Sequence, residues 1–100
     1  MTVSYQVVYW RDIPAQVKVR AGRERRARGL GERIQQAIDQ VAMRTGATKS
    51  DDYLEEWRSS EWQEREGELE AVLEAVVGEL EGLYSEARLK ALVSSGGRED

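Results

Sequence analysis

The sequence contains no cysteine and no histidine, and these two absences exclude most familiar catalytic and metal-binding arrangements. Without cysteine there is no disulfide, no thiolate chemistry and no cysteine metal site. Without histidine the commonest general base and the commonest transition-metal ligand are missing. A site built from carboxylates alone remains open, but no segment has the spacing of a calcium-binding loop. We therefore expect no metal and no cofactor, and we favour a protein without enzymatic activity.

Long apolar runs are missing as well. No stretch approaches the ~18–20 apolar residues that span a bilayer, and the N-terminus lacks the basic-then-apolar pattern of a signal peptide. We therefore expect a soluble, cytoplasmic protein that does not bind a membrane. The 100 residues, 40% of them hydrophobic, suffice for one core. The expected organisation is a single domain over residues 1–93, followed by a disordered polar tail over residues 94–100.

Proline occurs once, at Pro14, and it marks the hairpin around which the fold is organised. Residues 3–10 and 15–20 alternate in the manner of two strands. Pro14 has no N–H and holds the preceding residue extended, so the reversal is predicted at Arg11-Asp12. The alternation places Trp10 on the face opposite Val3, Tyr5, Val7 and Tyr9. Two strands alone are marginal in water, so this hairpin needs helices on its apolar face, a second hairpin from another subunit, or both.

Three helices are predicted after the hairpin. Apolar residues at spacings of three and four indicate a helix from about Arg23 to Thr45, ended by Gly46. A capping box at residues 48–51 predicts a short helix through Arg58. Ser60 is the predicted N-cap of a long third helix that ends near Val93. The expected fold class is α+β, with the helices packed on one face of a small antiparallel sheet.

Charge is divided unevenly along the chain. Residues 1–50 carry ten Lys and Arg against four Asp and Glu, whereas residues 51–100 carry five against fifteen. The halves therefore have net charges of 10 − 4 = +6 and 5 − 15 = −10. Such halves attract each other within one fold, and they also favour head-to-tail association between chains.

The first candidate site is an arginine cluster that we expect to bind an anion or a partner, namely Arg20, Arg23, Arg25 and Arg26. These residues fall at a predicted helix start, where free N–H groups already attract anions, so a nearby negative charge is expected. Three sources stay open: the chain's own Glu64, Glu66, Glu68 and Glu70, an acidic protein surface, or a phosphate- or carboxylate-bearing small molecule. Nucleic acid is disfavoured because the chain is acidic overall and carries no recognised RNA-binding motif.

The second candidate is the hairpin turn with Trp10, Arg11 and Asp12. Tryptophan and arginine are enriched where proteins contact one another, so the turn is a candidate partner-binding anchor. The alternative is structural: Asp12 caps the turn and Trp10 covers the edge of the core. Trp57 and Trp62 leave the same choice open between core packing and an exposed aromatic groove.

Three segments resemble a small bacterial family known as the virulence factor domain. They are residues 8–17 (Val-Tyr-Trp-Arg-Asp-Ile-Pro-Ala-Gln-Val), residues 33–44 with Arg33, and residues 50–58 (Ser-Asp-Asp-Tyr-Leu-Glu-Glu-Trp-Arg). The resemblance covers roughly residues 3–93, and its first segment is the most specific. It implies no reaction and no catalytic residue. It does imply a setting near folate- and corrinoid-dependent methyl transfer.

These observations favour a small non-enzymatic accessory module that binds a protein partner. One candidate partner is a second copy of the chain, in a homodimer joined through the free edge of the hairpin. The alternative is an anionic-metabolite-binding protein in which the arginine cluster holds carboxylates, with a polyglutamyl folate as an example. A stand-alone enzyme is the least favoured class.

Overall fold

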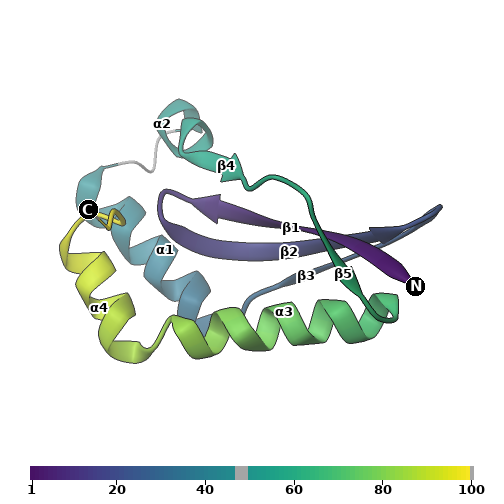
Figure 1. Cartoon of the computed structure of the whole chain (residues 1–100). Coiled ribbons are helices and arrows are strands. Elements are labelled where there is room, and N and C mark those ends of the chain that lie inside the picture. The colour runs from purple at the N-terminus through teal and green to yellow at the C-terminus, as the bar shows by residue number, and fades with distance from the viewer. Residues whose placement is uncertain (47–49, 100) are drawn as a thin grey trace.

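The computed structural model describes residues 1–46 and 50–99, apart from the side chains of residues 50–52. Within these ranges the chain forms five strands: β1 (Thr2–Trp10), β2 (Ile13–Ala21), β3 (Glu24–Gly29), β4 (Trp57–Ser59) and β5 (Gln63–Glu66). It forms four helices over the same ranges: α1 (Glu32–Thr45), α2 (Ser50–Glu55), α3 (Leu69–Leu83) and α4 (Glu86–Ser94). The predicted α+β class is confirmed (Figure 1).

The predicted hairpin is present, with β1 and β2 antiparallel and joined at Arg11 and Asp12. A bulge, however, changes which face of the sheet the last side chains of β1 occupy. The pairing passes from Val8 opposite Gln16 to Tyr9 opposite Pro14, so Ala15 is the extra residue. Trp10 therefore lies opposite Ile13, and both side chains are fully buried. The prediction that Trp10 faces away from Val3 and Val7 was wrong, because the bulge reverses the alternation.

The hairpin has no free edge. The strand order is β3-β2-β1-β4, and β5 also pairs with β1. The hairpin edge that was expected to be free for a dimer is therefore occupied within the chain, by β3 on one side and by β4 and β5 on the other. β4 and β5 follow each other along β1, and Ser60 lies between them, where its N–H donates to the Val7 carbonyl at 2.8 Å.

The arginine-rich segment after the hairpin is a strand, whereas a helix was predicted from Arg23. β3 pairs with β2 from Glu24 opposite Ala21 to Gly29 opposite Gln16. Only at Glu32 does the predicted helix begin, and it ends as expected at Gly46, whose φ of 75° is left-handed. The buried stripe of α1 is Ile34, Ala37, Ile38, Val41 and Ala42.

The later helices also differ from the prediction. α2 ends at Glu55, and Trp57 and Arg58 belong to β4. The capping box predicted at residues 48–51 lies outside the described residues and side chains. Ser60 caps no helix, and the predicted long helix is divided into α3 and α4. Ser85 separates them, and its side chain accepts a hydrogen bond from the backbone N–H of Arg88.

Helices cover one face of the sheet, and the core lies between the two layers. In Figure 1, α3 runs beneath the strands, while α1 and α4 pack beside each other at the end near the hairpin turn. The sheet contributes Val3, Val7, Trp10, Ile13, Val17 and Val19 to the core, and α3 contributes Leu69, Val72, Leu73, Val76, Val77 and Leu80. No helix in the described part of the chain is both long and apolar enough to cross a membrane.

The last residues return to the hairpin turn. The sequence predicts a disordered tail after Val93, whereas the structure extends α4 to Ser94 and lays residues 95–99 against Arg11 and Asp12. The backbone N–H of Asp12 donates to the Gly97 carbonyl at 2.8 Å. The guanidinium of Arg11 donates to the Gly96 carbonyl at 2.6 Å.

Candidate functional site

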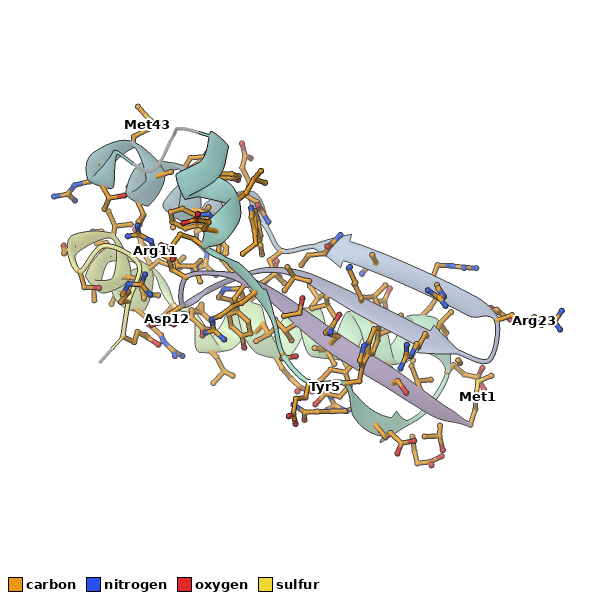
Figure 2. All side chains as sticks on the ribbon, turned by 90° about the horizontal axis from the view of Figure 1, so that it is seen from above. Met1, Tyr5, Arg11, Asp12, Arg23 and Met43 are labelled. Carbon is orange, nitrogen blue, oxygen red and sulfur yellow. The ribbon has the colours of Figure 1, made fainter. Side chains whose placement is uncertain are left out.

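The face of the sheet opposite α3 is open, and its cations have no carboxylate partner among the described residues. Figure 2 shows this face, with α3 behind the strands. The side chains of Lys18, Arg20 and Arg25 lie on it, because Val17 and Val19 point into the core and the alternating positions point outward. Arg20 and Arg25 are directly paired across β2 and β3. We call Lys18, Arg20, Arg25 and the neighbouring Trp62 the basic sheet face.

Trp62 gives this face its aromatic component. It lies between β4 and β5, in the bulge where the edge of the sheet shifts by one residue. Its side chain is 37% exposed, and the guanidinium carbon of Arg20 lies 3.9 Å from the ring centroid. A cation over an indole ring is favourable, and it also holds both side chains in place. Together the residues line a shallow hollow of about 360 Å³ formed by Lys18, Val19, Arg20, Arg25, Arg26, Ala27 and Trp62.

On the opposite side of β3, the arginines are paired with carboxylates. Arg26 and Arg28 point toward α3, where Arg26 lies 3.3 Å from the Glu70 carboxylate and Arg28 lies 3.6 Å from it. Arg28 also lies 4.0 Å from Glu74. Of the four glutamates predicted to neutralise the arginines, Glu70 does so. Glu66 instead accepts hydrogen bonds at the start of β1, from Thr2 at 2.7 Å.

Two kinds of arginine therefore emerge from one sequence cluster. Within residues 1–46 and 50–99, ion pairs to Asp or Glu are present for Arg26 and Arg28 and absent for Arg20, Arg23 and Arg25. Arg20, Arg25 and Arg26 share the hollow, whereas Arg23 lies in the β2–β3 turn at the far end of the sheet (Figure 2). The sequence prediction missed Lys18 and did not connect Trp62 with the arginines. The alternation of Gln16, Lys18 and Arg20 was the available signal for Lys18.

The second candidate site, the hairpin turn, makes its contacts with other segments of the same chain. Trp10 is fully buried, and its indole Nε1–H donates to the Tyr53 carbonyl at 3.0 Å. The ring of Tyr53 lies 5.6 Å from that of Trp10 and 5.8 Å from that of Trp57. Trp57 is half-buried against the core. The aromatic residues therefore fix α2 and β4 on the end of the hairpin.

Arg11 and Asp12 also have partners within the chain. Arg11 has a positive φ of 54°, its backbone N–H donates to the Glu56 carbonyl at 3.0 Å, and its Nε lies 3.5 Å from the Glu56 carboxylate. The Asp12 carboxylate accepts from the backbone N–H of Glu99 at 2.7 Å and from Arg58 at 3.0 Å. These two contacts hold the pKa of Asp12 below its usual value. The turn thus makes the contacts within the chain that the structural alternative predicts, and partner binding through it stays a prediction.

A small hollow of about 370 Å³ lies beside this turn, between Tyr9, Asp12, Arg58, Ser60, Tyr84 and Glu99. Its charged groups are paired: Arg88 binds Glu99 through two nitrogens, at 2.7 and 2.8 Å, and lowers the pKa of that carboxyl. Burial raises the pKa of Tyr84, which lies under the Arg88 guanidinium. In the described residues no group of three or more Asp or Glu side chains is placed to hold a metal ion.

The fold is that of a small α+β domain whose sheet carries a basic face on its uncovered side. A family model described as "Virulence factor" matches residues 8–93. The chain therefore belongs to the virulence factor family, as its sequence resemblance predicts. No curated protein and no solved structure is significantly similar to it.

Proposed function

We propose that the chain is a small non-enzymatic interaction module that binds an acidic surface of a partner protein through the basic sheet face. The observation that carries this proposal is the contrast between the two sides of β3. The cations that point toward α3 have carboxylate partners, whereas Lys18, Arg20 and Arg25 have none in the described part of the chain. An acidic surface on another protein would supply the negative charge that these three cations lack.

The face also has the composition of a protein contact. Arginine and tryptophan are enriched in interfaces, and here Arg20 is held by stacking on Trp62. Ordering a long side chain before binding reduces the entropy lost on association. The chain as a whole is acidic, with a net charge of −4, whereas Lys18, Arg20 and Arg25 give this face a local positive charge.

The experiment is a titration of isotope-labelled protein with poly-L-glutamate, followed by the backbone amide and tryptophan indole signals in NMR spectra. We expect the signals of Lys18, Arg20, Arg25 and the Trp62 indole to shift, and the shifts to diminish at high salt. The double variant Arg20→Glu with Arg25→Glu should weaken binding by more than about tenfold, because two attractive contacts become repulsive.

The matched control changes charge by the same amount elsewhere. Arg44 on α1 and Lys90 on α4 are exposed and lie away from the sheet. Arg44→Glu with Lys90→Glu should leave the titration nearly unchanged. If both double variants weaken binding equally, the attraction depends on net charge alone, and the proposed face is wrong.

A second candidate function is the binding of a small carboxylate- or phosphate-bearing molecule in the hollow beside Trp62. It is favoured by Arg20 and Arg25, which line the same space of about 360 Å³ and have no carboxylate partner within the described residues. A polyglutamyl chain such as that of a folate has the required carboxylates. Triglutamate is a suitable probe. Saturable shifts confined to the hollow, with no tighter binding of poly-L-glutamate, would favour this function over the protein partner.

A further inference from the structure

The outer edge of β3 is an unpaired strand edge. β3 is last in the strand order, so in the part of the chain described here it pairs with β2 alone. Its six residues, Glu24–Gly29, are all exposed. β3 contains no proline, and its pairing with β2 is regular from end to end. It therefore lacks the breaks by which many proteins protect a sheet edge.

The hydrogen-bond pattern shows which residues present their backbone outward. The Leu30 N–H donates to the Ala15 carbonyl at 2.9 Å, directly beyond the last pair of the β2–β3 ladder. Inward and outward groups alternate along an antiparallel strand, so Arg28 and Arg26 face β2, and Ala27 and Arg25 face outward.

An independent contact agrees with this assignment. The carbonyl of Arg25 accepts a hydrogen bond from the guanidinium of Arg26 at 2.8 Å. It therefore points away from the β2 ladder, toward the outer edge of β3. The backbone of Ala27 lies two residues further along the strand and has the same outward orientation, so the two residues together offer donors and acceptors to a further strand.

The charges on β3 limit which strand can be added. A second copy of β3 would bring arginines opposite arginines, which is unfavourable. A guest strand would place alternate side chains on the two faces of the sheet. On the open face they would lie beside Arg25, Arg20 and Lys18, which lack carboxylate partners within the described residues. On the other face they would lie beside Arg26 and Arg28, which Glu70 and Glu74 already neutralise.

We propose that β3 takes up an extended segment of another protein as an additional strand, and that this segment carries acidic residues at every second position. Backbone hydrogen bonds to Ala27 and Arg25 would supply affinity, and the alternating carboxylates would set the register by facing the basic sheet face. The inference rests on the proposed function and specifies how the acidic partner binds.

The first test uses two synthetic peptides of identical composition. One alternates valine and glutamate, and the other has a block of valines followed by a block of glutamates. Both carry the same net charge, so electrostatic attraction alone gives the alternating peptide no advantage. Strand addition predicts at least about tenfold tighter binding of the alternating peptide, because only its carboxylates share one face.

The second test removes an outward N–H while preserving the hydrogen bonds to β2. Ala27→Pro should weaken binding of the alternating peptide about tenfold, because proline cannot donate and is tolerated on an edge strand. Ala27→Ser keeps the N–H and should bind normally. If Ala27→Pro does not fold, wild-type protein with peptides N-methylated at alternate residues makes the same test. One methylated set should lose binding and the other should retain it.

The outcomes separate the two proposals. Strand addition is overturned if both peptides bind equally and if neither Ala27→Pro nor N-methylation weakens binding. If Arg20→Glu with Arg25→Glu then abolishes that binding, the basic sheet face remains as the binding surface. Failure of both peptides and of poly-L-glutamate to bind overturns both proposals. Preferential binding of the alternating peptide, lost with Ala27→Pro or with one methylated set, supports strand addition.

Discussion

The carboxylate of Asp12 accepts a hydrogen bond from the backbone N–H of Glu99 at 2.7 Å, across a separation of 87 residues. The contact joins the first turn of the chain to its last described residues. Arg58 donates to the other oxygen of the same carboxylate at 3.0 Å, so the charge of Asp12 is compensated from two sides. A group near the start of the sequence thus holds the end of the chain and the edge strand β4 together.

The first prediction concerns pH. Because the pKa of Asp12 is lower in the folded state than in the unfolded state, its contribution is fully present above the unfolded value. That value is about 3.9, and the contribution is lost as the pH falls through the folded pKa. Asp12→Asn should cost about 1 kcal/mol at neutral pH and should make the acid loss of stability shallower. Urea unfolding at a series of pH values measures both effects.

Asp39→Asn is the control for this series, because Asp39 is an exposed aspartate on α1. It should leave the pH profile nearly unchanged. Glu66 and Glu79 also have lowered pKa values and contribute in both proteins, so the difference between wild type and Asp12→Asn reports on Asp12 together with Glu99, whose pKa the Asp12 charge raises. An Asp12→Asn profile that parallels the wild-type profile would contradict the role given to this carboxylate.

The second prediction concerns the buried indole of Trp10. Trp10→Phe keeps an aromatic ring but removes the donor to the Tyr53 carbonyl and leaves a small void. We expect a loss of about 2 kcal/mol from these two effects, together with faster amide exchange in α2. Trp62→Phe, at the exposed position, should change stability by less than about 0.5 kcal/mol. Equal losses of stability in the two variants would show that the buried environment of Trp10 contributes nothing to the stability of the fold.

The third prediction compares two glycines with positive φ. Gly97 has a φ of 83°, and a Cβ there would lie 3.2 Å from both Arg11 Cδ and Val41 Cγ1. Gly22 has a φ of 60°, and a Cβ there would meet nothing within 4 Å. Gly22→Ala should cost about 1 kcal/mol from backbone strain alone. Gly97→Ala should cost more, because Arg11 or Val41 must move, and thermal unfolding of the two variants measures the difference.

The first hairpin could be predicted from sequence because its signals are local. Alternating valines and a single proline fix two strands and the turn between them. The bulge at Ala15 could not be predicted in this way, because it depends on tertiary packing, in which Trp10 and Ile13 are both buried and Trp10 hydrogen-bonds to Tyr53 of α2. A shift of one residue moves a side chain to the other face, so an otherwise correct strand prediction placed Trp10 wrongly.

The exposed strands were missed for a different reason. β3 and β5 consist mainly of Glu, Arg and Gln, which are good helix formers and show no apolar alternation. Their strand conformation comes from pairing with β2 and β1, a tertiary effect that outweighs local preference. The basic sheet face was therefore only partly predictable. Its arginines could be found from the sequence, but their division between two faces follows from β3 being a strand.

The edge of the sheet opposite β3 is short and interrupted. It consists of β4 and β5, of three and four residues, with the Ser60 hydroxyl accepting the Val7 N–H between them at 2.9 Å. Short, interrupted edges are poor templates for another strand. A chain of this shape can accept a guest at one border and cannot pass the interaction on at the other. With a guest strand added to β3 as proposed, we expect association to stop at a one-to-one complex without growing into fibres.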